Sequence, residues 1–117
     1  MSDAPRDPDC LFCSIVAGDV PATVVASSER SLAFRDIEPK APVHVLIVPR
    51  RHLPTVAELA QESPEELADL VLTARAVADA EGLDQGYRLV FNTGPDAGQA
   101  VFHAHLHVLG GAALGWR

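Results

Sequence analysis

Residues 103–111 read HAHLHVLGG and place three histidines at every second position. Because side chains alternate between the two faces of a β-strand, this spacing predicts a strand with three imidazoles on one face and Ala104, Leu106 and Val108 on the other. A strand rises about 3.3 Å per residue, so the outer two imidazoles would lie about 13 Å apart. One metal ion binds histidine at about 2.0–2.1 Å and cannot reach all three. The three histidines are therefore expected to have different roles.

The composition is that of an ordinary globular protein. Of 117 residues, 48% are hydrophobic and 21% are charged, and a chain of this length can bury one core. We expect a flexible tail over residues 1–8 and a single domain over residues 9–117. No apolar run approaches the roughly 20 residues of a membrane span, and residues 1–8 lack the features of a signal peptide, so the cytoplasm is the expected location.

The charge balance narrows the class of partner. The net charge is −7, from 9 basic and 16 acidic residues. An acidic protein of this kind has no broad electrostatic attraction for nucleic acid or anionic lipid, so neither is expected as a partner. Any phosphate ligand would be held by local backbone amides and imidazoles.

Apolar periodicity and turn residues predict two helices and five strands. A short helix is expected over residues 9–17, with Asp9 as its N-cap and Gly18 as its stop. A long helix is expected from Ser63, its N-cap, to Gly82, with Glu66 completing a capping box. The strands are expected at residues 23–26, 31–36, 43–48 and 87–92 and at the histidine row. These elements predict an α+β fold, a five-stranded antiparallel sheet with the long helix on one face.

Both cysteines lie in one CxxC motif, Cys10 and Cys13. In a cytosolic protein this spacing indicates half of a metal site or a redox pair, and a redox motif would follow a strand and open a longer helix. A metal is therefore favoured. A closed structural zinc site takes four sulfur or nitrogen ligands, which His52 and His103 would complete. The alternative for His52 is a solvated loop histidine.

The other histidines suit nucleophilic attack on phosphorus. A neutral imidazole attacks through one ring nitrogen while the other holds its proton on an acceptor, and His105, central in the row, is the predicted nucleophile. His107 and His44 are then available to donate to phosphoryl oxygens or to protonate the leaving atom. The loop containing Gly98 and ending near Gln99 would bring backbone amides to the phosphate. A purely structural histidine row is the alternative.

The pattern His-φ-His-φ-His-φ-φ, in which φ is apolar, resembles the signature of the histidine triad (HIT) family, in its nucleotide-binding, nucleoside-phosphoramidase branch. Further segments resemble the family in order along residues 9–117. They are DCLFCSI (9–15), FRDI (34–37), APVH (41–44), PRRH (49–52), YRLVFNTG (87–94) and GQAVFH (98–103). The resemblance implies a HIT-like fold.

The resemblance also implies roles for individual residues. His105 matches the nucleophile that forms a covalent nucleotidyl-histidine, which water then hydrolyses. His107 and His44 match residues that bind the α-phosphate and assist proton transfer, and Asp36 matches the acceptor for the ribose hydroxyls. Asn92 and Gln99 match phosphate-side contacts, and the base pocket is walled at positions matching Phe12, Ile15, Phe34 and Ile37, for which plain core packing is the alternative.

The implied activity is cleavage of the P–N bond of purine nucleoside phosphoramidates, with a nucleoside monophosphate or phosphoramidate as ligand. Members with the cysteine pair bind one structural zinc per chain at positions matching Cys10, Cys13, His52 and His103. Members are usually homodimers, joined through the long helix and a sheet edge. Departures over residues 112–117, around Trp116 and Arg117, leave leaving-group selectivity open.

Other activities are compatible with the same motifs. A His-x-His pair could hold a catalytic zinc. The pocket could belong to a nucleotide-binding adaptor without turnover. A nucleotidyltransferase or a dinucleoside polyphosphate hydrolase would share the covalent step and differ in the acceptor or the bond cleaved.

Overall fold

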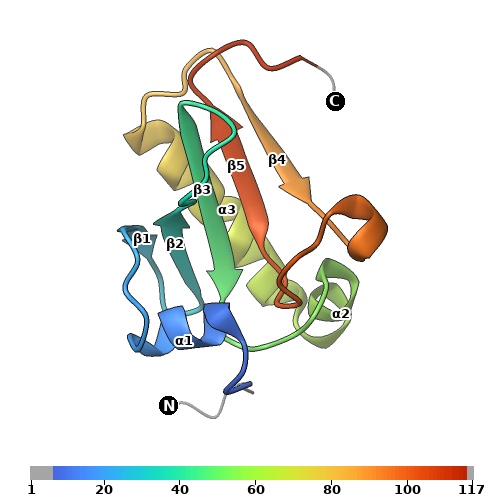
Figure 1. Ribbon diagram of the computed structural model, residues 1–117. Coiled ribbons are helices and arrows are strands. Elements are labelled where there is room, and N and C mark those ends of the chain that lie inside the picture. Colours follow the sequence, from blue (N-terminus) through green and yellow to red (C-terminus); the bar gives the residue numbers. More distant parts are fainter. Residues whose placement is uncertain (1–6, 116–117) are drawn as a thin grey trace.

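The computed structural model describes residues 7–115 and contains one five-stranded sheet with helices packed against it (Figure 1). Residues 1–6 of the predicted tail, together with Trp116 and Arg117, lie outside the described residues. The elements in chain order are α1 (Leu11–Ala17), β1 (Val24–Ser27), β2 (Ser31–Arg35), β3 (Val43–Pro49), α2 (Val56–Glu62), α3 (Pro64–Ala80), β4 (Tyr87–Phe91), the 3₁₀ turn η1 (Pro95–Ala97) and β5 (Leu106–Gly110).

The strands lie in the order β1-β2-β3-β5-β4, and every neighbouring pair is antiparallel. The predicted α+β class and five-stranded antiparallel sheet are confirmed, and the first four strands agree with their predicted bounds to within one residue. The dense apolar content of β3 suits its central position, where four successive residues, Val45–Val48, are buried. None of the described helices has the length and hydropathy that a membrane span requires.

Each face of the sheet has its own core. On one face α3 packs Leu70, Ala74 and Val77 against Val45 and Ile47 of β3. The residues predicted to face away from the histidines, Ala104, Leu106 and Val108, lie in this core as expected. On the opposite face the short helix α1 packs against β2 and β3, in front of the sheet in Figure 1. Strand alternation places the histidines of β3 and β5 on this second face.

The start of α1 differs from the prediction. Cys10, not Asp9, is the N-cap, and its Sγ accepts from the backbone N–H of Cys13 at 3.4 Å. Asp9 lies in the preceding turn, where its N–H donates to the Asp7 carboxylate. Gly18 ends the helix with a φ of 85°, as predicted, because the left-handed conformation suits a residue without a side chain.

The helical layer contains an element that the sequence pattern did not predict. Residues Val56–Glu62 form α2, which begins with a capping box between Thr55 and Glu58. The capping box predicted for α3 is only half formed. Ser63 Oγ accepts from the Glu66 N–H, but the Glu66 carboxylate forms an ion pair with Arg51 at 2.8 Å instead of returning to the cap.

The histidine row is not one strand. The strand β5 begins at Leu106, so His107 lies in the sheet while His103 and His105 lie in the segment before it. The Ala104 N–H donates to the carbonyl of Leu53 at 2.8 Å, and the His103 carbonyl accepts from the ring of His105 at 2.7 Å. Backbone groups that would pair with a neighbouring strand therefore have other partners.

Candidate active site and metal centre

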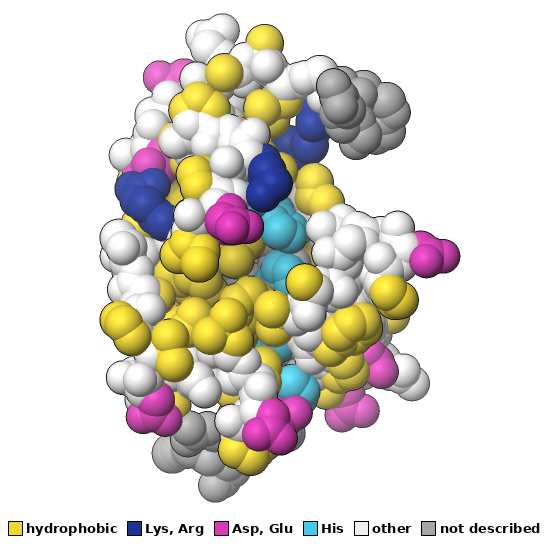
Figure 2. Space-filling model, in the orientation of Figure 1, with side chains coloured by type: hydrophobic (Ala, Val, Ile, Leu, Met, Phe, Trp, Pro, Cys, Tyr) yellow, Lys and Arg dark blue, Asp and Glu magenta, His cyan; other side chains and the backbone are white. Residues whose placement is uncertain are grey.

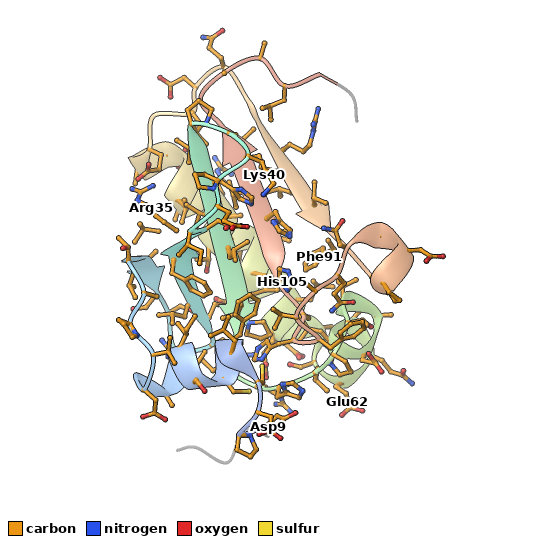
Figure 3. All side chains as sticks on the ribbon, viewed as in Figure 1. Asp9, Arg35, Lys40, Glu62, Phe91 and His105 are labelled. Carbon is orange, nitrogen blue, oxygen red and sulfur yellow. The ribbon has the colours of Figure 1, made fainter. Side chains whose placement is uncertain are left out.

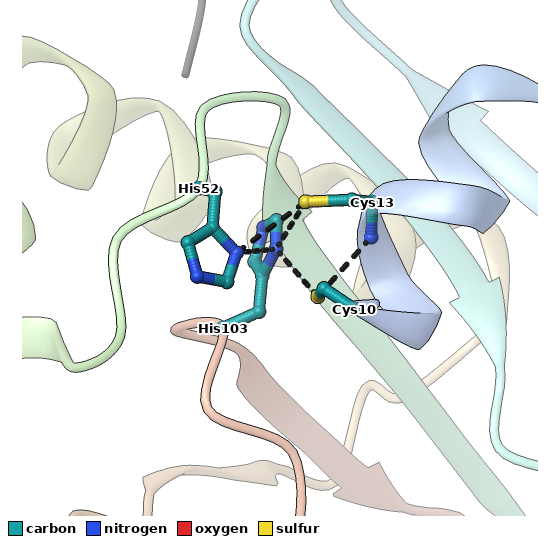
Figure 4. A group of neighbouring side chains, drawn as sticks. All are labelled: Cys10, Cys13, His52 and His103. Carbon is teal, nitrogen blue, oxygen red and sulfur yellow. Dashed lines mark hydrogen bonds between the residues drawn. The ribbon is translucent and has the colours of Figure 1, made fainter. Parts of the chain in front are cut away.

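Side chains from three separate segments converge at the start of α1. Cys10 and Cys13 come from α1 and its cap, His52 from the loop after β3, and His103 from the segment before β5 (Figure 4). One ligand atom from each, two Sγ and two Nδ1, lies within 4.8 Å of all the others. The structure thus brings together the four residues predicted as zinc ligands, and His52 is not a solvated loop histidine.

The spacing of these atoms fits a tetrahedral zinc site. Bond lengths of about 2.3 Å to sulfur and about 2.0–2.1 Å to nitrogen place sulfur and nitrogen about 3.6 Å apart and two nitrogens about 3.3 Å apart. Sγ of Cys13 lies 3.3 Å from His52 Nδ1 and 3.5 Å from His103 Nδ1. Cys10 Sγ lies 3.5 Å from His103 Nδ1, and the two Nδ1 atoms are 3.3 Å apart. Four protein ligands of this kind make a closed, structural site.

The protonation state of His103 also fits a metal ligand. Its Nε2 donates to the carbonyl of Pro49 at 2.8 Å, which leaves the lone pair on Nδ1 facing the cluster. The side chain is fully buried, and burial lowers the pKa of His103 to about 4. The neutral imidazole that binds metals is therefore the stable form.

A chain of hydrogen bonds assigns the tautomers of His44 and His107. The backbone N–H of Lys40 donates to His44 Nδ1 at 3.0 Å, so the proton of His44 resides on Nε2. That N–H donates to His107 Nδ1 at 2.9 Å, and the proton of His107 therefore resides on its own Nε2. His107 Nε2 is buried and has no hydrogen-bond partner among residues 7–115. A buried donor without a partner is costly, so a ligand acceptor at this point would be bound favourably.

His105 has the complementary arrangement. Its Nδ1 donates to the carbonyl of His103 at 2.7 Å, and Nε2 therefore carries a lone pair. Burial lowers the pKa of His105 below its ordinary value, which keeps this nitrogen unprotonated at neutral pH. His105 and His107 have ring centroids 5.0 Å apart, so a nucleophilic nitrogen and a free N–H donor occupy neighbouring rings. Attack on a phosphoryl group requires such a pair, a nucleophile and a donor to the phosphoryl oxygen.

A cavity of about 430 Å³ opens beside these two rings. In Figure 2 a column of histidines runs down this face with hydrophobic side chains gathered beside it, and Figure 3 places His105 near the start of β5. Phe12 and Phe34 are buried and also belong to the second core, whereas the side chain of Ile37 is 93% exposed. The predicted residues that line the cavity are Phe12, Ile15, Phe34, Asp36, Ile37, Asn92, Gly98, His105 and His107.

A second cavity, of about 560 Å³, meets the first at His107. Lys40 lines both cavities, whereas the apolar Leu109 and Leu114, His44 and the cationic Arg88 line only the second. Arg88 donates to the carbonyls of Leu114 and Gly115 and so holds the C-terminal segment over this cavity. Lys40 and Arg88 were not predicted as site residues, because only the fold brings Lys40, from the loop before β3, and Arg88, from β4, to the same cavity.

Gln99 does not line either cavity. Its Oε1 accepts from the Gly94 N–H at 2.8 Å, and its Nε2 donates to the carbonyls of Pro54 and Val101. The side chain predicted to reach a phosphate instead braces the loop that carries Gly98. Gly98 has a φ of 88° and lines both cavities.

A second group of possible metal ligands, Asp36, His44 and His107, does not suit a metal ion. The relevant atoms are close, with Asp36 Oδ2 3.4 Å from His44 Nε2. However, His44 Nδ1 already accepts from the Lys40 N–H, so coordination through Nε2 would require both ring nitrogens to be unprotonated. A neutral imidazole cannot supply that. The arrangement favours a hydrogen-bonded group over a catalytic metal.

Comparison with known proteins agrees with this geometry. A family model described as the HIT domain matches residues 17–114. An uncharacterized HIT-like protein of Synechococcus elongatus is 44% identical over 108 residues, covering 92% of this chain and 95% of the relative. The 14 kDa zinc-binding protein of Zea mays is 43% identical over 112 residues, covering 94% of this chain and 88% of the relative.

Solved structures match over a similar length. A HIT family hydrolase from Legionella pneumophila has a TM-score of 0.88 at 49% identity, covering 92% of this chain and 97% of that one. A HIT family hydrolase from Clostridium thermocellum has a TM-score of 0.91 at 42% identity, covering 96% and 98%. Sequence and structure agree over nearly the whole length of these proteins, and the chain belongs to the HIT family.

Proposed function

We propose that this protein is a nucleotide-binding hydrolase that cleaves the P–N bond of purine nucleoside phosphoramidates through a covalent nucleotidyl-histidine. One observation carries the proposal. The unprotonated Nε2 of His105 and the unpartnered Nε2–H of His107 belong to adjacent rings on one cavity. The names of the two solved relatives, both HIT family hydrolases, support hydrolysis in general.

In the first step His105 Nε2 attacks phosphorus and the P–N bond breaks. The nitrogen takes one proton from solvent and leaves as a neutral amine. His107 Nε2–H donates to a phosphoryl oxygen, and the His44 N–H holds His107 in the tautomer that can do so. Because His105 Nδ1–H stays on the His103 carbonyl, the ring keeps its orientation while positive charge develops on it.

In the second step water attacks phosphorus and breaks the bond to His105. The nucleoside monophosphate leaves, His105 returns to its neutral form, and the proton lost by water balances the one taken up by the amine. No step requires a metal ion, so the Cys10, Cys13, His52 and His103 cluster is assigned a structural zinc, one per chain. The name of the Zea mays relative and the tetrahedral spacing support this assignment.

The walls of the first cavity suit a nucleoside. Apolar side chains on one side, among them Phe12, Ile15 and Ile37, would contact the flat faces of a purine. Asp36 lines both cavities, with its Oδ2 3.4 Å from His44 Nε2, and would accept hydrogen bonds from the ribose hydroxyls. Its Oδ1 already accepts from the Glu38 N–H at 2.8 Å, which orients the carboxylate.

We also propose a homodimer. The β4 strand pairs only with β5 within residues 7–115, so its other edge is available for a partner. Apolar side chains are exposed on β4 and α3, with Leu72 65%, Tyr87 40% and Leu89 38% exposed. Exposed apolar side chains on a strand with an unpaired edge are typical of an interface between subunits. Sedimentation equilibrium that gives the monomer mass at micromolar concentration would contradict the dimer.

The activity is tested by incubating the protein with an adenosine phosphoramidate and measuring amine release. Wild-type protein is expected to release amine, and His105→Ala is expected to release none above background. Undiminished turnover by His105→Ala would contradict the covalent mechanism. Tight binding of AMP by wild-type protein without amine release would instead indicate a non-catalytic nucleotide-binding module.

A further inference from the structure

His105 is held in place by contacts outside the sheet. The predicted nucleophile lies before β5, in a segment where the backbone has no strand partner, although attack at phosphorus demands a fixed ring. A displacement of about 1 Å can lower a rate by about 100-fold. Contacts other than the sheet must therefore fix this residue.

One of these contacts comes from a residue of the metal cluster, and a second comes from the residue that follows His52. His103 uses its backbone carbonyl to accept from His105 Nδ1 at 2.7 Å, while its imidazole points into the cluster with Nε2 bound to Pro49. The carbonyl that selects the tautomer of His105 thus belongs to His103, whose ring is held by the Pro49 carbonyl and by the metal cluster. Next to it, the Ala104 N–H is held by Leu53, which directly follows His52.

The third contact is the ring of Phe12, which lies between the two cysteines in sequence. Phe12 packs edge-to-face against His105, with centroids 5.0 Å apart and planes at 84°. The same ring meets His103 at 6.1 Å and Phe34 at 5.6 Å. Phe12 is only 5% exposed and is flanked in the chain by Leu11 and Cys13, with Cys10 two residues before it, so a metal that held both cysteines would also hold the backbone from which this ring projects.

We propose that the Cys10, Cys13, His52 and His103 cluster, when it holds zinc, positions the nucleophile His105. It does so through the His103 carbonyl, which fixes the tautomer, and through the Phe12 ring, which fixes the plane of the imidazole. This inference rests on the proposed function, in which His105 attacks phosphorus. His103 and Phe12 are then positioning residues for the reaction, and the metal site serves the chemistry without touching substrate.

A matched pair of variants at His52 tests the role of the cluster. His52 lines neither substrate cavity, so its replacement removes no direct contact with the ligand. His52→Ala removes a ligand, whereas His52→Cys supplies a Cys₃His set that also binds zinc. For each protein we would measure zinc content, the ¹⁵N NMR signals of the His105 ring, AMP affinity and the single-turnover rate of amine release.

Wild type and His52→Cys are expected to hold zinc and to show one His105 tautomer, with the proton on Nδ1. His52→Ala is expected to lose zinc, to show mixed or averaged His105 signals, and to release amine about 10- to 100-fold more slowly in a single turnover. Its AMP dissociation constant is expected to rise by a smaller factor than the rate falls, because Phe12 is one of several residues that line the first cavity.

A second pair keeps the test decisive where His52→Ala fails to fold. Phe12→Leu and Phe34→Leu remove one ring each from the same wall of the first cavity, but only Phe12 contacts His105. Both variants should retain zinc and weaken AMP binding to a similar extent. Only Phe12→Leu is expected to disturb the His105 ring signals, and its single-turnover rate is expected to fall about 10-fold or more below that of Phe34→Leu.

Two results would overturn the inference. One is a zinc-free, folded His52→Ala with wild-type His105 signals and rate, and the other is equal behaviour of Phe12→Leu and Phe34→Leu. Failure of the proposed function has a different signature, because wild-type protein would then release no amine. The NMR signals of His105 report its tautomer and position independently of turnover, so the two failures can be told apart.

Discussion

His44 Nε2 donates to His107 Nδ1 at 2.9 Å, and this bond determines what His107 can do. Because the Lys40 N–H occupies His44 Nδ1 at 3.0 Å, the direction of the bond is fixed, and His107 presents its own Nε2–H. That group is buried and lacks a partner within the described part of the chain. Folding has prepared a donor for a ligand oxygen, and its unmet hydrogen bond is the strongest sign of an anionic ligand here.

Replacing His107 tests this donor. His107→Phe keeps a ring of similar size but removes the N–H, and kcat for phosphoramidate hydrolysis is expected to fall by about 100- to 1000-fold, the usual cost of losing one donor to developing charge. His107→Gln retains an N–H donor and should keep more activity than His107→Phe. Steady-state kinetics checks both, and a His107→Phe variant as active as His107→Gln would argue that the N–H donor of His107 does not contribute to catalysis.

Protonation of His107 is expected to affect stability. Burial, followed by the nearby His105 and His44, lowers the pKa of His107 from its ordinary value of 6.5 to about 4. Between these values the unfolded chain binds more protons than the folded one, so the contribution of His107 to the free energy of unfolding is lost as pH falls from 6.5 towards 4.

Denaturant unfolding of wild type and His107→Phe at several pH values isolates this effect. The other titrating groups, including the metal ligands, are common to both proteins. The wild-type protein is expected to lose more stability than the variant on acidification over this range. Parallel curves for the two proteins would show that the pKa of His107 is not lowered by folding.

The metal cluster is expected to contribute to stability. Purified wild-type protein should contain about one zinc per chain, and Cys13→Ser should contain little. Because zinc binds the folded state, its loss is expected to lower the free energy of unfolding by more than about 4 kcal/mol. Elemental analysis and thermal denaturation check this prediction. A wild-type protein purified without chelators and found free of zinc would contradict the structural site.

Two apolar residues that line the first cavity, Ile37 and Phe34, are expected to differ in how much they contribute to folding. Ile37 is 93% exposed, so Ile37→Ser should change the free energy of unfolding by less than about 0.5 kcal/mol. Loss of its apolar contact with a purine should weaken AMP binding by about 5- to 10-fold. Phe34 is 3% exposed, and Phe34→Ala should cost about 3–5 kcal/mol of stability. Calorimetric titration of Ile37→Ser with unchanged affinity would place the base elsewhere.

The sequence allowed prediction of the elements whose stabilisation is local. The strands around β3 and the helix α3 have apolar periods and end signals that act over a few residues, and they lie where expected. The helix α2 was missed because its seven residues bury only Leu59 and present no apolar stripe. Glu66 was assigned to a capping box because its partner Arg51 is brought near it only by the fold.

In the site, too, features that depend on contacts between distant segments were not predicted from the sequence. The CxxC motif and the histidine row predicted which side chains would meet, and all four cluster residues do. The row was wrongly taken as one strand because the partners of Ala104 and His103, a loop carbonyl and a side chain, cannot be read from alternation. The tautomers of the histidines, and the places of Lys40 and Arg88 around His107, also depend on contacts between distant segments.

The most direct test of the central claim is mass spectrometry of the protein quenched during turnover of an adenosine phosphoramidate. A covalent nucleotidyl-histidine predicts an added mass of one adenylyl group on the peptide that contains His105. The bond that joins it should be stable in alkali and should break in acid. The adduct should be absent from His105→Ala. Amine release by wild-type protein with no adduct at any quench time, or with the adduct on another residue, would contradict His105 as the nucleophile.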